Sequence, residues 1–293
     1  MQRVVAIVNP VSGRYGRVEA LREVGRLLAG HDRELEVLTT DGVGHATILA
    51  QERAAGADAV LVVGGDGTVN EVVNGLVGTT TPIVVWGAGT ENLLARELSL
   101  PRGPRGVVGA LLGGEVIHFD VGVLNDRRFL CVAGIGFDAE CVARLKTVRR
   151  GHISHFDHIV PVWRTFRTHR FPDLRVTVDD VCVFDGRGFA LIGMIPRYSA
   201  GLRIWPRAQY DDGLLDVCVM PCASRRELAG HAWRALWRRH TGRGQVVYCQ
   251  GRRVSISSTQ DVPIELDGEL VGSLPAECSV LVRAVTFLRE RTK

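Results

Sequence analysis

The sequence predicts an α/β domain with a doubly wound, mostly parallel sheet, followed by an antiparallel β-sandwich domain. Two observations predict this order. Short apolar runs alternate with helical patterns over residues 1–120, and strand-length runs separated by turn signals follow after Gly113-Gly114. We therefore expect a boundary near residue 120, with domains of residues 1–120 and 121–293, and we allow the last residues to pack back on the first domain.

Strands and helices alternate in the first domain. The predicted strands are residues 4–8, 35–38, 59–63 and 83–86. The predicted helices are residues 18–28, 45–55, 69–76, 91–98 and 107–112. Because residues 59–63 are apolar throughout, they suit a parallel strand that is buried on both faces. Ligands of such a sheet bind at the carboxyl ends of its strands.

Strands dominate the second domain. The predicted strands are residues 116–123, 128–132, 174–178, 189–195, 214–220, 245–248, 253–257 and 280–288. Turn signals such as Asn125-Asp126 and Asp185-Gly186 separate several of them. Two helices, near residues 155–167 and 226–239, interrupt the strands.

Composition excludes several classes of protein. The net charge of +4 is modest and no basic run interleaves with aromatic residues, so we expect no nucleic-acid partner. The seven cysteines include no C-x-x-C pair, which argues against zinc sites and disulfide frameworks. No apolar run reaches the roughly twenty residues that span a bilayer, and the N-terminal residues lack the features of a signal peptide. We expect a cytoplasmic protein whose membrane contact is peripheral.

The most informative motif is Gly64-Gly65-Asp66-Gly67-Thr68, between a predicted strand and a predicted helix. Glycines at such a turn let the backbone approach a ligand closely, and the amides at a helix start suit a phosphate. Asp66 adds a negative charge to the same turn. That charge is unfavourable beside a phosphate unless a cation or a hydroxyl proton lies between them. The motif therefore indicates phosphate chemistry as well as phosphate binding.

Three further turns follow predicted strands of the same sheet. They are Asn9-Pro10-Val11-Ser12-Gly13, Thr39-Thr40 and Gly87-Ala88-Gly89-Thr90-Glu91-Asn92. A single glycine after a strand is more often a tight connection than a binding site. Four turns on one sheet edge indicate a ligand site, because the ligand crevice lies there. The P-loop and dinucleotide fingerprints are absent, so a nucleotide must be held in another way.

Several ordered motifs resemble the diacylglycerol kinase catalytic family, a group of soluble lipid kinases that includes sphingosine and ceramide kinases. In the first domain they are Asn9-Pro10-x-Ser12-Gly13, Gly64-Gly65-Asp66-Gly67-Thr68-x-Asn70-Glu71 and Gly89-Thr90-x-Asn92-x-x-Ala95-Arg96. In the second domain they are Gly134-x-Gly136-Phe137-Asp138-Ala139, Pro196-Arg197-Tyr198, Asp211-Asp212-Gly213-Leu214-Leu215-Asp216-Val217 and Leu266-Asp267-Gly268-Glu269. The resemblance covers essentially the whole chain and implies an NAD kinase/diacylglycerol kinase-like fold.

The resemblance also implies roles for residues. ATP would contact Asn9, Pro10, Val11, Ser12, Gly13, Thr40, Gly64, Gly65, Gly67, Thr68, Asn70, Glu71, Gly89, Thr90 and Asn92. Glu269 would be the general base, with Asp267 beside it and Asp66 as a third catalytic carboxylate. Mg²⁺ would be held by Asp212 and by backbone carbonyls of Gln209 and Leu214. Residues 1–120 would be the nucleotide-binding catalytic domain and residues 121–293 the lipid-substrate domain.

These roles suit phosphoryl transfer, which needs positioned substrates, a metal that screens the phosphates and a carboxylate that accepts the hydroxyl proton. Asp66 comes from the first domain, and Asp267 and Glu269 come from the second, so we expect domain closure to bring them together. From the sequence alone, Asp267-Gly268-Glu269 is equally an ordinary hairpin turn with solvated carboxylates. Asp211-Asp212-Gly213 is likewise an ordinary turn, which is compatible with a structural metal.

The chain departs from the family pattern at two places. Leu93 stands where many bacterial diacylglycerol kinases have an acidic residue, so a sphingoid base or another lipid alcohol is the alternative substrate. Around residue 200 the family often has an asparagine and a run of glycines. This chain has Met194 and Ser199-Ala200-Gly201, so we expect a stiffer or differently shaped loop.

We therefore expect an ATP- and Mg²⁺-dependent lipid kinase that converts diacylglycerol to phosphatidic acid, and we leave a homodimer open. The alternative from another class is a nucleotide- or lipid-binding protein that has lost catalysis. The intact Asp66 and Glu269 argue against that alternative.

Two segments carry tryptophan and arginine residues that suit an anionic membrane surface. One contains Trp233, Arg234, Trp237, Arg238, Arg239 and His240, and the other contains His152, His155, Trp163, Arg164, Arg167 and Arg170. The alternative is an amphipathic helix that packs on the sandwich and leaves a solvated basic face. The sequence favours this alternative for each segment taken alone.

Overall fold

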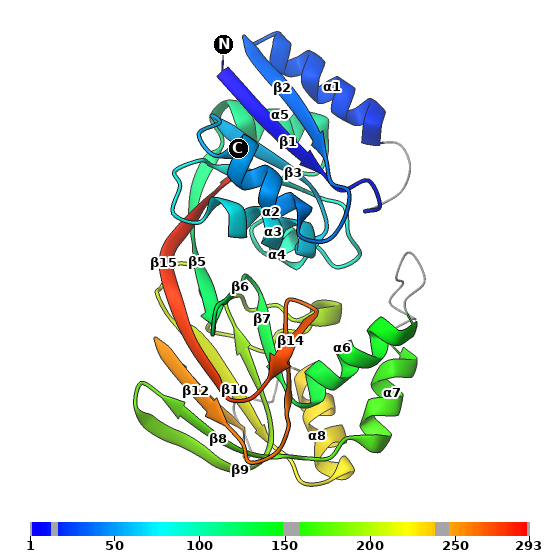
Figure 1. The fold of residues 1–293 in the computed structure, drawn as a ribbon, viewed down its shortest axis with the longest axis vertical. Coiled ribbons are helices and arrows are strands. Elements are labelled where there is room, and N and C mark those ends of the chain that lie inside the picture. The colour runs from blue at the N-terminus through cyan, green and yellow to red at the C-terminus, as the bar shows by residue number, and fades with distance from the viewer. Residues whose placement is uncertain (1, 13–16, 149–158, 238–245, 292–293) are drawn as a thin grey trace. The chain divides into compact units, whose positions relative to one another are not determined.

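The computed structural model describes residues 2–12, 17–148, 159–237 and 246–291 (Figure 1). The chain divides into two compact units, one from residues 1–119 and 283–293 and the other from residues 120–282. Strands β5 (Glu115–Leu124) and β15 (Ala276–Arg289) each contribute residues to both units. The functional roles expected of the two domains stay predictions.

The first unit contains a parallel sheet. Its strand order is β2 (Arg33–Thr39), β1 (Gln2–Val8), β3 (Ala59–Gly64) and β4 (Ile83–Gly87). The last part of β15 joins beside β4, where Phe287 pairs with Ile83 in the parallel direction. Residues 4–7 of β1 and all of β3 are buried, as expected of central strands covered on both faces. The predicted parallel sheet is confirmed.

Helices connect and cover these strands. Helices α1 (Arg17–Ala29) and α5 (Pro104–Gly113) pack together against one face of the sheet, which includes Val4 and Leu61. Helix α2 (His45–Leu49) continues as a π-helical turn over Ala50–Ala54 and packs on α3 (Asp66–Leu76). The contact is close because Gly75 of α3 has no side chain: a Cβ there would lie 2.6 Å from the Cβ of Ala50. The short helix α4 (Leu93–Glu97) follows β4.

The strands of the second unit pair in the antiparallel direction. The long strand β9 (Val181–Gly193) pairs along its first half with β8 (Asp173–Val178), and along its second half with β7 (Val132–Ile135) and β10 (Leu215–Pro221). Strand β10 also pairs with β11 (Val247–Gly251), and β7 with β13 (Pro263–Leu266). Strand β8 also pairs with β12 (Arg253–Ser257), which pairs with the first part of β15. The predicted antiparallel sandwich is confirmed.

The strand expected at residues 128–132 is two strands. Strand β6 (Arg127–Phe129) pairs with the end of β5, whereas β7 begins at Val132 and pairs with β9 and β13. At the break, the backbone amides of Leu130, Cys131 and Val132 donate to the carboxylate of Asp267. A distant side chain therefore replaces strand partners there, which local sequence patterns do not reveal.

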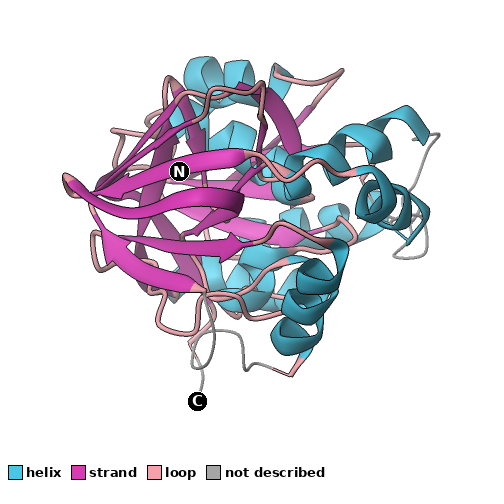
Figure 2. Ribbon diagram, turned by 90° about the horizontal axis from the view of Figure 1, so that it is seen from below, coloured by secondary structure: helices cyan, strands magenta, loops and turns pink. Residues whose placement is uncertain are grey.

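The described part of the second unit has three α-helices where two were expected, and a 3-10 turn over Ser199–Gly201. The additional helix is α6 (Phe137–Val148), which begins directly after Gly136 with its φ of 87°. Helices α7 (Ile159–Thr168) and α8 (Arg225–Leu236) correspond to the two expected helices, and α8 starts at a capping box of Ser224 and Glu227. Residues 155–158 and 238–239 of the expected helices lie outside the described residues. The three helices lie on one side of the unit's strands (Figure 1, Figure 2).

Candidate active site

In the first unit, the predicted turns follow strands that end at one edge of the parallel sheet. Val8 at the end of β1 is paired with both Thr39 and Val63, so β1, β2 and β3 end level with one another. The pairing of Gly64 with Gly87 brings the end of β4 to the same edge. The structure therefore brings the four turns together, as the motifs indicated.

The turns after β3 and β4 meet through their backbones. A Cβ on Gly89 would lie 2.8 Å from the Cα of Gly65, so a side chain at this position would push the two turns apart. Asn92, with a φ of 47°, fixes the second turn. Its Oδ1 accepts the amide of Gly89 at 2.8 Å, and its Nδ2 donates to the carbonyl of Gly89 at 2.7 Å. The two turns form a tightly packed backbone surface.

Helix α3 starts inside the glycine motif. Its N-cap is Gly65, which has no side chain to accept the amides of the first turn, so these amides suit an external anion. The buried Thr68 accepts a hydrogen bond from Nδ2 of Asn9 at 3.0 Å, which ties the turns after β1 and β3 together. Oδ1 of Asp66, the first residue of α3, accepts the amide of Leu94 at 3.4 Å and links this turn to α4.

Two predicted nucleotide contacts have partners inside the protein. Glu71 accepts the amides of Gly44 and Ala46 at 2.9 and 3.1 Å, so its carboxylate caps α2, whose own N-cap is a glycine. Oδ1 of Asn70 accepts from Nδ2 of Asn74 at 2.6 Å. The contacts of Glu71 tie α3 to the start of α2, and the contact of Asn70 lies within α3.

The other predicted nucleotide contacts differ in exposure. Thr40 is buried, Ser12 and Thr90 are half-buried, and Pro10 and Val11 are exposed. Gly13 lies outside the described residues.

In the second unit, Asp267 and Glu269 flank Gly268 in the turn between β13 and β14 (Glu269–Ser273). Leu266 pairs with Glu269, and Asp267 and Gly268 have φ values of 48° and 87°, which suit the Asp-Gly pair of a two-residue hairpin turn. The ordinary hairpin turn that the sequence allowed for Asp267-Gly268-Glu269 is therefore present. Glu269 is exposed, whereas Asp267 is half-buried.

The carboxylate of Asp267 is occupied by backbone amides. Its Oδ2 accepts from Leu130 at 2.7 Å, and its Oδ1 accepts from Cys131 and Val132 at 2.9 Å each. The amide of Asp267 also donates to the carbonyl of Val132 at 2.9 Å. These contacts anchor the hairpin turn on the start of β7.

The predicted metal residues lie in the turn before β10. Oδ1 of Asp212 accepts the amide of Leu214 at 3.0 Å, and the buried Asp120 accepts the amide of Gly213 at 2.7 Å. Burial raises the pKa of Asp212, and the charges of Asp120 and Asp211 raise it further. A cation would relieve this repulsion, and one carboxylate with backbone oxygens is a donor set that Mg²⁺ accepts. The residues present therefore fit the ion.

The metal site would depend on few side chains. Within the described ranges, no group of three or more histidine, cysteine, aspartate or glutamate side chains is placed to hold a metal. Backbone oxygens and water would complete the ligands, as expected for the carbonyls of Gln209 and Leu214.

A buried acidic cluster, not predicted as part of the site, adjoins the hairpin turn. Glu265 of β13 is 1% exposed and accepts the amide of Gly268 at 2.7 Å. Asp138 of α6 is 8% exposed and accepts from the hydroxyl of Tyr198. The signal for Glu265 was available, because it is the acidic residue within the otherwise apolar strand Pro263-Ile264-Glu265-Leu266.

Comparisons with known proteins identify the family. Residues 3–124 match the diacylglycerol kinase catalytic domain, and residues 131–289 match the YegS C-terminal NAD kinase beta sandwich-like domain. The diacylglycerol kinase of Staphylococcus epidermidis is 30% identical to this chain, over 94% of the chain and 88% of the relative. The chain belongs to the diacylglycerol kinase family. The diacylglycerol kinase of Mycobacterium tuberculosis is 29% identical over 99% of this chain and 96% of the relative.

A solved structure agrees with this membership of the diacylglycerol kinase family. It is a crystal structure from Bacillus anthracis str. Sterne of a protein assigned as a diacylglycerol kinase. It has a TM-score of 0.78 and 26% sequence identity, over 98% of this chain and 97% of that chain. The predicted family, the fold class and the assignment of the chain as a lipid kinase are confirmed.

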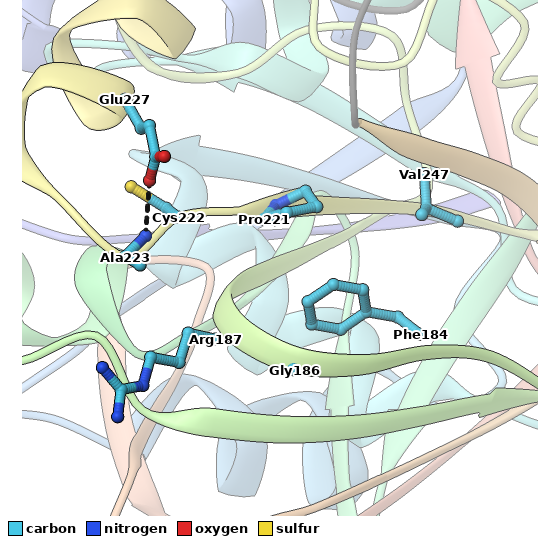
Figure 3. Close-up of a pocket in the computed structure, with 8 residues that line it drawn as sticks. All are labelled: Phe184, Gly186, Arg187, Pro221, Cys222, Ala223, Glu227 and Val247. Carbon is cyan, nitrogen blue, oxygen red and sulfur yellow. Dashed lines mark hydrogen bonds between the residues drawn. The ribbon is translucent and has the colours of Figure 1, made fainter.

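One surface pocket of this diacylglycerol kinase family member contains none of the predicted site residues. It has a volume of about 640 Å³ and is lined by Phe184, Gly186, Arg187, Pro221, Cys222, Ala223, Glu227 and Val247 (Figure 3). Glu227 accepts the amide of Ala223 at 2.7 Å, which is part of the capping of α8. Burial raises the pKa of the Cys222 thiol to about 11, so the thiol is protonated at neutral pH and is a poor nucleophile.

Proposed function

We propose that the protein transfers the γ-phosphate of ATP to the hydroxyl of diacylglycerol, giving phosphatidic acid and ADP. The observation that carries the proposal is the start of α3, where Gly65 caps the helix and the backbones of Gly65 and Gly89 pack together. Helix-start amides without a side-chain cap suit the phosphates of a nucleotide. Membership of the diacylglycerol kinase family supports a lipid acceptor.

In the proposed reaction, the sheet edge with Asn9, Thr40 and Thr90 holds the nucleotide. Glu269 accepts the proton of the lipid hydroxyl while the hydroxyl oxygen bonds to the γ-phosphorus. The bond between the γ-phosphorus and the bridging oxygen breaks, and ADP leaves with that electron pair. The exposed side chain of Glu269 supports this role. The amide contacts of Asp267 favour a positioning role, and Asp66 would face the cation or the incoming hydroxyl.

Mg²⁺ would be held by Asp212 with the carbonyl groups of Gln209 and Leu214. When bound, Mg²⁺ would supply positive charge against the acidic residues of this turn. The neighbouring carboxylates of Asp120 and Asp211, whose charges act on Asp212, support a cation at this turn.

Transfer of label from radioactive ATP to a panel of lipid alcohols in mixed micelles tests the proposal. The panel contains diacylglycerol, ceramide and sphingosine, with and without Mg²⁺. Labelled phosphatidic acid that requires Mg²⁺ is the expected product. If only sphingosine or ceramide were labelled, that lipid would be the substrate in place of diacylglycerol. ATP binding without transfer to any lipid would favour the inactive binding protein.

Leu93 favours the sphingoid or other lipid alcohol as the second candidate. It is the half-buried first residue of α4, next to Leu94, whose amide contacts Asp66. The apolar side chain at this position differs from the acidic residue of many bacterial relatives. If Leu93 sets the substrate, Leu93→Asp should raise the preference for diacylglycerol over sphingosine. An unchanged preference would remove Leu93 from this role.

We also propose that α7 and α8 bring the protein to the inner face of the cytoplasmic membrane as a peripheral protein. Trp163 of α7 is 58% exposed. Trp233 of α8 is 63% exposed, and Trp237, the C-cap of α8, is 59% exposed. These exposed rings are available to a lipid surface. Leu228, His231 and Ala235 of α8 are buried, so α8 also packs within its unit, as the alternative expects. Among the described residues, no helix combines the length and the apolar character needed to cross a bilayer.

Charge supports the same surface. Arg164 and Arg167 accompany Trp163 on α7, and Arg234 lies next to Trp233 on α8. Each basic residue near an anionic surface contributes about 1 kcal/mol of attraction. His152, His155, Arg238, Arg239 and His240, also expected to contribute, lie outside the described residues.

A further inference from the structure

The side chains of Asp138 and Glu265 meet over a glycine. Gly134 of β7 lies beneath both: a Cβ there would overlap Oδ2 of Asp138 and lie 2.7 Å from Oε1 of Glu265. The space that the missing side chain leaves is therefore filled by two carboxyl oxygens from different elements, α6 and β13. Both residues are almost completely buried, at 8% and 1% exposure.

The hydrogen bonds of this pair require a proton. Tyr198 donates to Oδ1 of Asp138, and the amide of Gly268 donates to Oε2 of Glu265. Among the described residues, Oε1 of Glu265 receives no donor although it is buried. Two ionised carboxylates would also repel each other strongly in a site that water does not reach. A proton on Glu265 removes both penalties, because its hydroxyl then donates to Asp138.

The pair is connected to the turn that bears Glu269. Oε2 of Glu265 holds the amide of Gly268, and the carboxylate of Asp267 holds three amides on the other side of the turn. The buried carboxyl group of Glu265 and the half-buried one of Asp267 therefore fix the two residues that precede Glu269. The side chain of Glu269 itself stays exposed.

We propose that Asp138 and Glu265 share one proton as a carboxyl–carboxylate pair, and that Glu265 is a positioning residue for the turn that carries Glu269. The catalytic part of this inference rests on the proposed function, because it takes Glu269 as the general base. The proton-sharing part rests only on the buried cluster. Glu265 does not touch the reacting atoms and acts through the amide of Gly268.

The surroundings favour the protonated pair. The titratable groups that face it are Tyr198 from the loop after β9, Cys141 from α6 and Asp267 from the hairpin turn. Burial raises the pKa of Glu265 well above its usual range, and the charge of Asp138 raises it further. Burial also raises the pKa of Asp138. Burial and the charge of Asp138 raise the pKa of Tyr198, so its hydroxyl stays protonated and donates to Asp138.

Two substitutions of Glu265 distinguish a role in hydrogen bonding within the acidic pair from a role in core packing. Glu265→Gln keeps an oxygen for the Gly268 amide and supplies N–H donors for Asp138, so we expect kcat within roughly threefold of wild type. Glu265→Leu supplies neither group, and we expect kcat to fall by about tenfold to a hundredfold with KM for ATP unchanged, since small misplacements of a catalytic group have this effect. Ile264→Ala, on the same strand, is the control for lost core packing.

Two measurements do not depend on catalysis. Infrared spectra at neutral pH should contain the carbonyl band of a protonated carboxyl group, which Glu265→Gln removes and Glu269→Gln keeps. Amide hydrogen exchange at Gly268 should be faster in Glu265→Leu than in Ile264→Ala of matched stability. If wild type phosphorylates no lipid, the proposed function fails, and these two measurements still decide on the pair. Absence of the band, or unchanged exchange and kcat in Glu265→Leu, would overturn the inference.

Discussion

Asn92 forms two hydrogen bonds with Gly89, accepting its amide at 2.8 Å through Oδ1 and donating to its carbonyl at 2.7 Å through Nδ2. The ring that they close holds the turn after β4 against Gly65, at the start of α3. The glycine motif is therefore only half of the nucleotide surface that we propose, and the other half depends on an asparagine with a φ of 47°.

Gly89→Ala should weaken ATP binding by about tenfold or more, which corresponds to about 1.4 kcal/mol. The new Cβ would lie 2.8 Å from the Cα of Gly65, so one backbone must move away from the other. Isothermal titration with ATP measures the effect. Gly42→Ala is the matched control, because a Cβ at Gly42 meets nothing within 4 Å. Equal affinities for the two variants would show that the contact between the turns does not shape the nucleotide site.

Asp267→Asn should destabilise the protein by about 1 to 3 kcal/mol, because it replaces a carboxylate oxygen that accepts buried amides with an N–H donor. Urea unfolding of the variant and wild type gives this difference in the free energy of unfolding. Asp261→Asn, an exposed site before β13, should change stability little. If Asp267→Asn abolished catalysis at full stability, Asp267 would be catalytic rather than a positioning residue.

Glu265→Gln should gain stability over wild type as the pH rises. The pKa of Glu265 is raised above its ordinary value of 4.5, first by burial and then by Asp138, so the folded protein keeps a proton that the unfolded chain releases. The contribution of this proton to the free energy of unfolding is fully present below pH 4.5. It is lost as the pH rises through the pKa that Glu265 has in the folded protein. Denaturant titrations from about pH 5 to about pH 9 should show a growing difference between the variants. A difference that stays constant with pH would contradict the shared proton.

Replacing Trp233 and Trp237 together by alanine should weaken binding to anionic vesicles by about a thousandfold, because burial of aromatic surface contributes about 2 kcal/mol per ring and about 1.4 kcal/mol corresponds to tenfold. Sedimentation with vesicles of anionic and of neutral lipid, at low and high salt, measures this effect. Val181→Ala is the control, since Val181 is 63% exposed and lies on β9. Unchanged binding of the double variant would place any membrane contact elsewhere.

Much of the first unit followed from its sequence. The run at residues 59–63 was apolar at every position, and the glycines after it marked the point where α3 begins, so a strand and a helix were both constrained by local pattern. The meeting of Gly65 with Gly89 required the parallel order of β3 and β4 as well, which the alternation of strands and helices provided.

The second unit was harder to predict, because side chains far along the chain decide its local structure. Asp267 takes the amides that a continuous strand through Leu130 would have used for pairing. Glu265 forms a buried acidic pair with Asp138, which lies far earlier in the sequence, and nothing in the local pattern of β13 indicates that partner. Helix α6 was not predicted, because its first residues, Phe137-Asp138-Ala139, entered only as part of the family resemblance.

Label transfer from ATP to diacylglycerol by wild type and Glu269→Gln tests the central claim most directly. With Glu269 as the general base, wild type yields labelled phosphatidic acid, and the variant loses about a hundredfold to ten-thousandfold of that rate while binding ATP with nearly unchanged affinity. Turnover of Glu269→Gln equal to wild type would remove Glu269 from its role. Failure of wild type to label any lipid alcohol while still binding ATP would contradict the proposed kinase activity.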